Sequence, residues 1–285
     1  MDALILAAGL GTRLSPITDV LPKALVPVGD KAVAEHALAA VQRHAHTVVL
    51  NAHHHRKSVE AFCEKQGLLC SSETALLGTA GGLARARTTL GRNDDVLVYN
   101  ADMWAPDIDL GPLLARFAAS EAAQGALLYR PAGPGEGNIG VNPDGRVVRL
   151  RQERFGPERQ GGFFLGIHVV AGTAVLPAMG CLVGDVYLPL LRAGATLVAE
   201  PYGGDVFDIG TPTALLDANV FWLRRRGIER WTAEGAQVHP DVRWSVVHDG
   251  ANVRAKGTRL LVGPGAQVSE PLDDAVVFEG RVARG

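Results

Sequence analysis

Cysteine is scarce in this chain, because its 285 residues include only three, namely Cys63, Cys70 and Cys181. No two of them form a C-x-x-C pair, and three are too few for a disulfide framework. A chain without such a framework needs no oxidising compartment in order to fold. We therefore expect the protein to reside in the reducing environment of the cytoplasm.

An excess of charge of either sign is also missing. The chain has 28 Lys and Arg against 30 Asp and Glu, a net charge of -2, so nothing in its charge favours a nucleic-acid partner. A signal peptide would need a basic start and a longer apolar run than the one that follows Asp2. Residues 161–184 carry no formal charge, but six glycines and Pro177 divide them into shorter elements. We expect neither a membrane nor a nucleic acid as partner.

The beginning of the chain contains a pattern that suits phosphate binding. An apolar run from Ala3 to Ala8 predicts a buried strand, which ends in Gly9 and Gly11. Glycines there allow backbone N–H groups to approach a ligand closely, because no Cβ is in the way. Arg13 and Lys23 add a guanidinium fork and a point charge. Together these groups could bind a polyphosphate.

Other interpretations of the same glycines remain to be weighed. Gly9 and Gly11 are not followed by the third glycine of the dinucleotide-binding fingerprint, and the next strand ends in Asn51, where that fold needs an acid. No Gly-Lys-Ser/Thr follows, which excludes a P-loop. A purely structural turn stays open at this point, although it leaves Arg13 and Lys23 unexplained.

The rest of the chain predicts two kinds of architecture. Strands alternate with helices up to residue 100, which favours an α/β fold with a largely parallel sheet, and a β-hairpin turns at Asn142-Pro143-Asp144-Gly145. From residue 228 the sequence changes: Ala236-Gln237-Val238 recurs fifteen residues later as Ala251-Asn252-Val253 and again as Ala266-Gln267-Val268. Repeats of this length predict a parallel β-helix.

Two acids follow apolar strands and could bind a metal ion. Asp102 comes after Val96–Ala101, and Asp208 follows Val206-Phe207. An acid in this position is often only a loop cap. Strand ends of open α/β sheets nevertheless line the ligand crevice, and the Mg²⁺ that accompanies phosphates prefers carboxylate ligands.

The string Gly9-x-Gly11-Thr12-Arg13-Leu14-x-Pro16-x-Thr18, with Pro22-Lys23-x-Leu25-x-Pro27, resembles the signature of the sugar-1-phosphate nucleotidyltransferases. The resemblance implies a Rossmann-like catalytic domain over residues 1–227, a mixed and mostly parallel sheet flanked by helices. It also implies a small left-handed β-helix over residues 228–285. From this tail we expect packing or homo-oligomerisation and no chemistry.

The resemblance also implies roles for particular residues. Arg13 would bind the β- and γ-phosphates, and Lys23 would lie near the α-phosphate and the sugar phosphate. Asp102 and Asp208 would hold Mg²⁺, which completes the catalytic set. The implied nucleotide-binding residues are Leu6, Ala8, Gly9, Gly11, Thr12, Arg13, Glu73, Gly78, Thr79 and Gly81. The implied sugar-binding residues are Asn138, Gly140, Glu153 and Gly166.

The expected activity joins a sugar 1-phosphate to a nucleoside triphosphate and releases pyrophosphate. Leu77-Gly78-Thr79-Ala80-Gly81 is most like the mannose-1-phosphate guanylyltransferases, which favours GTP with mannose 1-phosphate or a related sugar. A uridylyltransferase acting on N-acetylmuramate 1-phosphate or another hexose 1-phosphate is the alternative enzyme, because uridylyltransferases share variants of this string. Glu153-Arg154 replaces the usual Glu-Lys of the family, which leaves the identity of the sugar open. A catalytically silent homologue that binds a nucleotide sugar and regulates a partner is the alternative of another class.

Overall fold

The computed structural model describes residues 1–285 and consists of two compact units. The first unit contains residues 1–8 and 37–205, and the second contains residues 9–36 and 206–285. This division differs from the boundary predicted after residue 227. The loop that contains Gly9, Gly11 and Arg13 (the glycine loop) and the helix Pro212–Arg225 group with the C-terminal strands. The extent of the catalytic domain therefore stays a prediction.

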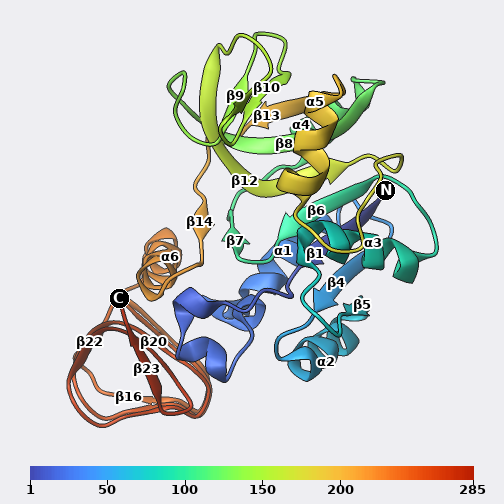
Figure 1. The fold of residues 1–285 in the computed structure, drawn as a ribbon. Coiled ribbons are helices and arrows are strands. Elements are labelled where there is room, and N and C mark those ends of the chain that lie inside the picture. The colour runs from blue at the N-terminus through green and yellow to red at the C-terminus, as the bar shows by residue number, and fades with distance from the viewer. The chain divides into compact units, whose positions relative to one another are not determined.

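The first unit is built on a ten-stranded mixed sheet (Figure 1). Its strands are β1 (Asp2–Leu6), β4 (Val48–Ala52), β5 (Leu69–Ser72), β6 (Val96–Asn100), β8 (Ala123–Ala132), β9 (Ile139–Val141), β10 (Val147–Leu150), β11 (Glu153–Arg154), β12 (Gln160–Val170) and β13 (Thr196–Pro201). The strands β5, β4, β1 and β6 are parallel neighbours, whereas β12 pairs antiparallel with β6, β8 and β9. Buried apolar runs such as Ala3 to Ile5 suit strands that are covered on both faces. The predicted α/β class is confirmed.

Helices flank this sheet. They are α2 (Arg56–Gln66), α3 (Gly78–Leu90), α4 (Gly111–Ala118), the π-helical turn η4 (Leu182–Tyr187) and α5 (Leu188–Arg192), and a short strand β7 (Met103–Trp104) follows β6. The helix α1 (Val33–Val41) begins in the second unit and ends in the first. Both α2 and α3 pack on β4 and β5, and α4 packs on β8, β12 and β13. No helix has the length and apolar character needed to cross a membrane.

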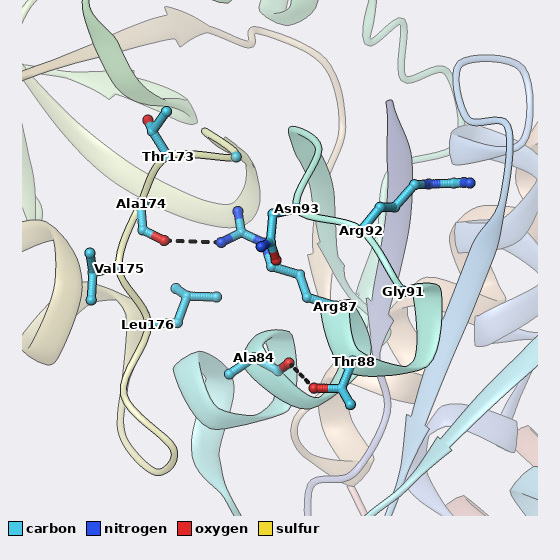
Figure 2. A pocket seen from close by; sticks show the side chains of 11 residues that line it. Ala84, Arg87, Thr88, Gly91, Arg92, Asn93, Thr173, Ala174, Val175 and Leu176 are labelled. Carbon is cyan, nitrogen blue, oxygen red and sulfur yellow. Dashed lines mark hydrogen bonds between the residues drawn. The ribbon is translucent and has the colours of Figure 1, made fainter.

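A buried arginine connects α3 to the chain that follows β12. Arg87 donates from Nη1 to the carbonyl of Ala174 (3.0 Å) and from Nη2 to the carbonyl of Ala171 (2.7 Å). Figure 2 shows the bond to Ala174 beside a surface hollow of about 630 Å³ that Arg87 and Ala174 help to line. Arg87 lies in the last turn of α3, where the helix dipole favours a cation. These two hydrogen bonds (the Arg87 clamp) fix the C-terminal end of α3, and the first turn of the same helix is a candidate nucleotide-binding site.

The second unit contains stacked parallel strands with a triangular outline in Figure 1. They are β15 (Arg230–Thr232), β16 (Gln237–Val238), β17 (Val242–Arg243), β18 (Ser245–Val247), β19 (Asn252–Val253), β20 (Gly257–Val262), β21 (Gln267–Val268) and β22 (Leu272–Phe278), closed by the antiparallel β23 (Arg281–Arg284). Paired residues lie fifteen positions apart, as Val247, Val262 and Val277 do. This stacking matches the repeat in the sequence and is consistent with a β-helix, whose handedness stays a prediction.

The other elements of the second unit include one long helix. They are the short helical turns η1 (Thr12–Leu14), η2 (Ile17–Asp19) and η3 (Lys23–Leu25), the strands β2 (Pro27–Val28), β3 (Lys31–Ala32) and β14 (Phe207–Asp208), and the helix α6 (Pro212–Arg225). Asn219 of α6 is buried, accepts from the Gly29 N–H (2.8 Å) and donates to the Pro27 carbonyl (3.2 Å). The helix thereby holds the chain that leaves the glycine loop.

Candidate active site

Buried side chains hold the glycine loop in place. Gly11 has a left-handed φ of 66°, and a Cβ there would lie 2.7 Å from Thr18 Cγ2. Thr18 Oγ1 in turn donates to the Gly11 carbonyl (3.0 Å). Leu14 and Ile17 are fully buried and anchor the two helical turns that follow. This packing leaves Gly9, Thr12 and Arg13 exposed, as a ligand-binding loop requires.

Three charged side chains meet beside this loop in the second unit. Arg13 Nη2 lies 3.9 Å from Asp208 Oδ2, and Lys23 Nζ lies 4.0 Å from Asp208 Oδ1. The side chains of Arg13 and Asp208 are 64% and 56% exposed, whereas that of Lys23 is only 12% exposed. The cluster carries two positive charges and one negative charge, so its excess charge suits an anionic ligand. Three of the four predicted catalytic residues are thus brought together.

Asp208 is positioned by the turn that opens α6. Ile209 is fully buried, and Thr211 caps the helix by accepting from the Ala214 N–H at 3.2 Å. A Cβ on Gly210 would lie 2.7 Å from Arg13 Nη2 and 2.9 Å from Asp208 Oδ1. Any larger residue at position 210 would therefore push the Arg13 guanidinium and the Asp208 carboxylate out of their present places.

The fourth predicted catalytic residue, Asp102, lies in the first unit, between β6 and β7. The Ala101 N–H donates to the Leu6 carbonyl (3.1 Å), which aligns the ends of β6 and β1. Gly166, a predicted sugar-binding residue, has φ +69°, and a Cβ there would lie 2.2 Å from Asn100 Nδ2. The structure thus places Gly166 beside the strand that leads to Asp102. A metal site shared by Asp102 and Asp208 stays a prediction.

The first turn of α3 packs closely against a neighbouring segment. A Cβ on Gly78 would lie 2.4 Å from the Gly180 carbonyl oxygen, and one on Gly81 would lie 2.5 Å from the Ala178 carbonyl oxygen. Thr79 Oγ1 accepts from the Leu182 N–H at 2.8 Å. This packing accounts for all three residues in structural terms, and their contact with a nucleotide stays a prediction.

Glu73 belongs to a buried polar network that the sequence alone does not single out. Its carboxylate accepts from Asn51 Nδ2 (2.7 Å) and from the Leu77 N–H (3.1 Å). Asn51 Oδ1 accepts from the N–H groups of Ala7 (2.6 Å) and Ala8 (3.2 Å). The only sequence signal for Asn51 is a polar residue at the end of an apolar strand. The amide of Ala8, a predicted nucleotide-binding residue, is therefore bonded to the protein.

The remaining predicted sugar-binding residues all contact other parts of the first unit. Glu153 accepts from Arg192 Nε (2.8 Å) and Nη2 (2.5 Å), and these hydrogen bonds lower its pKa. Asn138 Oδ1 accepts from the Phe164 N–H at 2.8 Å. A Cβ on Gly140 would lie 2.5 Å from the carboxylate of Glu158. Their role in binding a sugar stays a prediction.

Comparison with known proteins places these residues in a family context. Residues 2–151, which include the glycine loop and Asp102, match the family described as Nucleotidyl transferase. A probable mannose-1-phosphate guanylyltransferase 2 of Oryza sativa subsp. japonica is 29% identical over 287 residues, which cover 93% of this chain and 75% of that protein. An N-acetylmuramate alpha-1-phosphate uridylyltransferase of Caulobacter vibrioides is 39% identical over 109 residues, 35% of this chain and 45% of that protein.

Solved structures share the fold at low sequence identity. HddC from Yersinia pseudotuberculosis has a TM-score of 0.61 and 18% identity, and the match covers 78% of this chain and 99% of that one. A UDP-glucose pyrophosphorylase from Acinetobacter baumanii has a TM-score of 0.63 and 19% identity, covering 79% of this chain and 93% of that one. These similarities support the fold.

Proposed function

The chain belongs to the nucleotidyl transferase family, and from this premise we propose that it transfers GMP from GTP to mannose 1-phosphate or a related sugar phosphate. The general activity is that of a sugar-1-phosphate nucleotidyltransferase, as the names of its relatives describe. The preference for GTP is supported by the name of the rice relative and by the Leu77-Gly78-Thr79-Ala80-Gly81 string.

The observation that carries this proposal is the cluster of Arg13, Lys23 and Asp208 beside the glycine loop. A nucleoside triphosphate brings several negative charges, and an acceptor sugar phosphate adds about two more near neutral pH. Two anions repel each other, so the barrier consists mainly of charge and alignment. The exposed Arg13 guanidinium offers a fork to phosphate oxygens, and the nearly buried Lys23 ammonium offers a fixed point charge.

The reaction needs no general base from the protein. The second pKa of a phosphate monoester is about 6, so the attacking oxygen is already deprotonated near neutral pH. This oxygen forms a bond to the α-phosphorus, and the bond from that phosphorus to the bridging oxygen breaks. The bonding electron pair leaves with pyrophosphate, and no proton has to move. Arg13 and Lys23 would stabilise the charge that builds up on the leaving group and the α-phosphate.

A divalent metal ion fits the one carboxylate of this cluster, that of Asp208. Both oxygens of Asp208 are at least 3.9 Å from the neighbouring cations, and the carboxylate is more than half exposed, so it is accessible to a hard cation. We propose that Asp208 and Asp102 hold Mg²⁺. When bound, the ion would neutralise phosphate charge and orient the phosphate oxygens.

A substrate panel tests the proposal. The purified chain is incubated with Mg²⁺, each of the common nucleoside triphosphates and a set of sugar 1-phosphates, and pyrophosphate release is measured. We expect the highest kcat/KM with GTP and mannose 1-phosphate or a related sugar. Preference for UTP with N-acetylmuramate 1-phosphate would support the second candidate, which the 39% identity to the Caulobacter protein favours. No release from any pair would contradict both proposals.

A further inference from the structure

Asn51 joins three separate segments of the first unit through one side-chain amide. It is the fourth residue of β4 and is 2% exposed. Its oxygen accepts from the N–H groups of Ala7 (2.6 Å) and Ala8 (3.2 Å), and its nitrogen donates to Glu73 Oε1 (2.7 Å). The other Glu73 oxygen accepts from the N–H of Leu77, the residue before α3. The end of β1 and the start of α3 are thus connected through two side chains.

The orientation of the amide is determined by its neighbours. Two backbone N–H groups can only donate, so they require the amide oxygen, and the amide nitrogen is then left to donate to Glu73 Oε1. Glu73 is also 2% exposed. Polar groups at this depth are costly unless each has a partner. Neither an apolar residue nor a carboxylate at position 51 could satisfy the same three neighbours.

The position of this network along the chain points to function. Ala7 and Ala8 are the last buried residues before the exposed glycine loop begins at Gly9. Their N–H groups donate to Asn51, so this side chain fixes the orientation of the last two peptide groups before the glycine loop. A Cβ on Gly82 would lie 2.8 Å from Asn51 Nδ2 and 3.1 Å from Glu73 Oε1. A glycine at position 82 therefore allows α3 to approach the pair.

We propose that Asn51 is a positioning residue for nucleotidyl transfer, which aligns the chain end of β1, the segment that leads into the glycine loop, with the start of α3. This inference rests on the proposed function. Asn51 touches neither substrate nor metal in this scheme and acts through the backbone of Ala7 and Ala8. A shift of about 1 Å in reacting groups can cost about 100-fold in rate. Loss of the amide should therefore reduce turnover more than it reduces the amount of folded protein.

Four variants test the role of Asn51. Asn51→Ala removes both kinds of bond, and Asn51→Asp keeps the acceptor for the two N–H groups but places a carboxylate against Glu73. The double variant Asn51→Asp/Glu73→Gln restores a donor–acceptor pair with the roles exchanged, because the Gln amide can donate to Asp and accept from Leu77. Val49→Ala is the matched control, since Val49 is fully buried on the same strand and contributes only packing.

Pyrophosphate release at saturating and limiting nucleotide gives kcat and kcat/KM, and hydrogen exchange of the peptide that contains residues 1–10 reports on the Ala7 and Ala8 amides. We expect Asn51→Ala and Asn51→Asp to lose about 10- to 100-fold in kcat/KM and to exchange faster at these amides. The double variant should regain wild-type exchange at the Ala7 and Ala8 amides, and Val49→Ala should lower the melting temperature with kcat/KM nearly unchanged.

Two results would overturn the inference. One is an Asn51→Ala protein whose kcat/KM matches that of Val49→Ala at the same melting temperature. The other is a folded double variant whose Ala7 and Ala8 amides exchange as fast as those of Asn51→Asp. An inactive wild-type protein would instead contradict the proposed function itself, so the two failures can be told apart.

Discussion

Replacing Asp208 by Asn should abolish turnover and leave the fold almost unchanged. The carboxylate lies 3.9 Å from Arg13 Nη2 and 4.0 Å from Lys23 Nζ. Two unit charges 4 Å apart interact by about 1 kcal/mol in water, and exposed ion pairs contribute about 0–1 kcal/mol to stability. Since Asp208 is 56% exposed, we expect the free energy of unfolding to fall by less than about 1 kcal/mol.

The effect on catalysis should be far larger. Loss of one group that stabilises a transition-state oxyanion typically costs about 100- to 1,000-fold in kcat, and a proposed metal ligand should cost at least as much. The assay is pyrophosphate release with Mg²⁺, measured beside thermal unfolding of the same protein. Asp205→Asn is the matched control, because Asp205 is an exposed acid three residues earlier. Full turnover in Asp208→Asn would refute the assignment of Asp208 to the metal site.

Three further predictions concern stability. Burial lowers the pKa of His168 to about 3, so below about pH 6.5 the unfolded chain binds a proton that the native state does not bind. The free energy of unfolding should therefore fall by about 2 kcal/mol between about pH 6.5 and 4.5, and an equal slope in His168→Gln would contradict this. A Cβ on Gly29 would lie 1.9 Å from Trp222 Cε2 at a φ of 66°, so Gly29→Ala should cost about 2–4 kcal/mol in denaturant unfolding, and an unchanged midpoint would speak against this packing. Arg87→Met leaves two backbone carbonyls without their donors and should cost about 3 kcal/mol by the same measurement, whereas wild-type stability would exclude the clamp.

The sequence predicted those parts of the fold in which local pattern and tertiary environment agree. The apolar runs that became β1, β4 and β6 are buried on both faces, so their composition is sufficient to identify them. The fifteen-residue repeat predicted the stacked strands because each coil pairs with the next at that spacing. Thr211 followed by Pro212 is a pattern typical of a helix start, and α6 begins there with Thr211 as its cap.

The parts that were missed depend on contacts between distant segments. No element was predicted between residues 103 and 138, yet α4 and the ten-residue β8 lie there, and β8 is held by pairing with β12 and β13. The role of Asn51 depends on partners 43, 44 and 22 residues away. The glycines of α3 suggested a ligand contact, whereas the structure shows the backbone of residues 178–180 against two of them.

The central claim is nucleotidyl transfer to a sugar phosphate, and product analysis tests it most directly. The chain is incubated with Mg²⁺, GTP and mannose 1-phosphate, and the products are separated and identified by mass spectrometry and ³¹P NMR. We predict that a GDP-sugar and pyrophosphate form in equal amounts, and that added pyrophosphate reverses the reaction. Formation of nucleoside diphosphate and free phosphate, or no product with any nucleoside triphosphate and sugar 1-phosphate, would contradict the account.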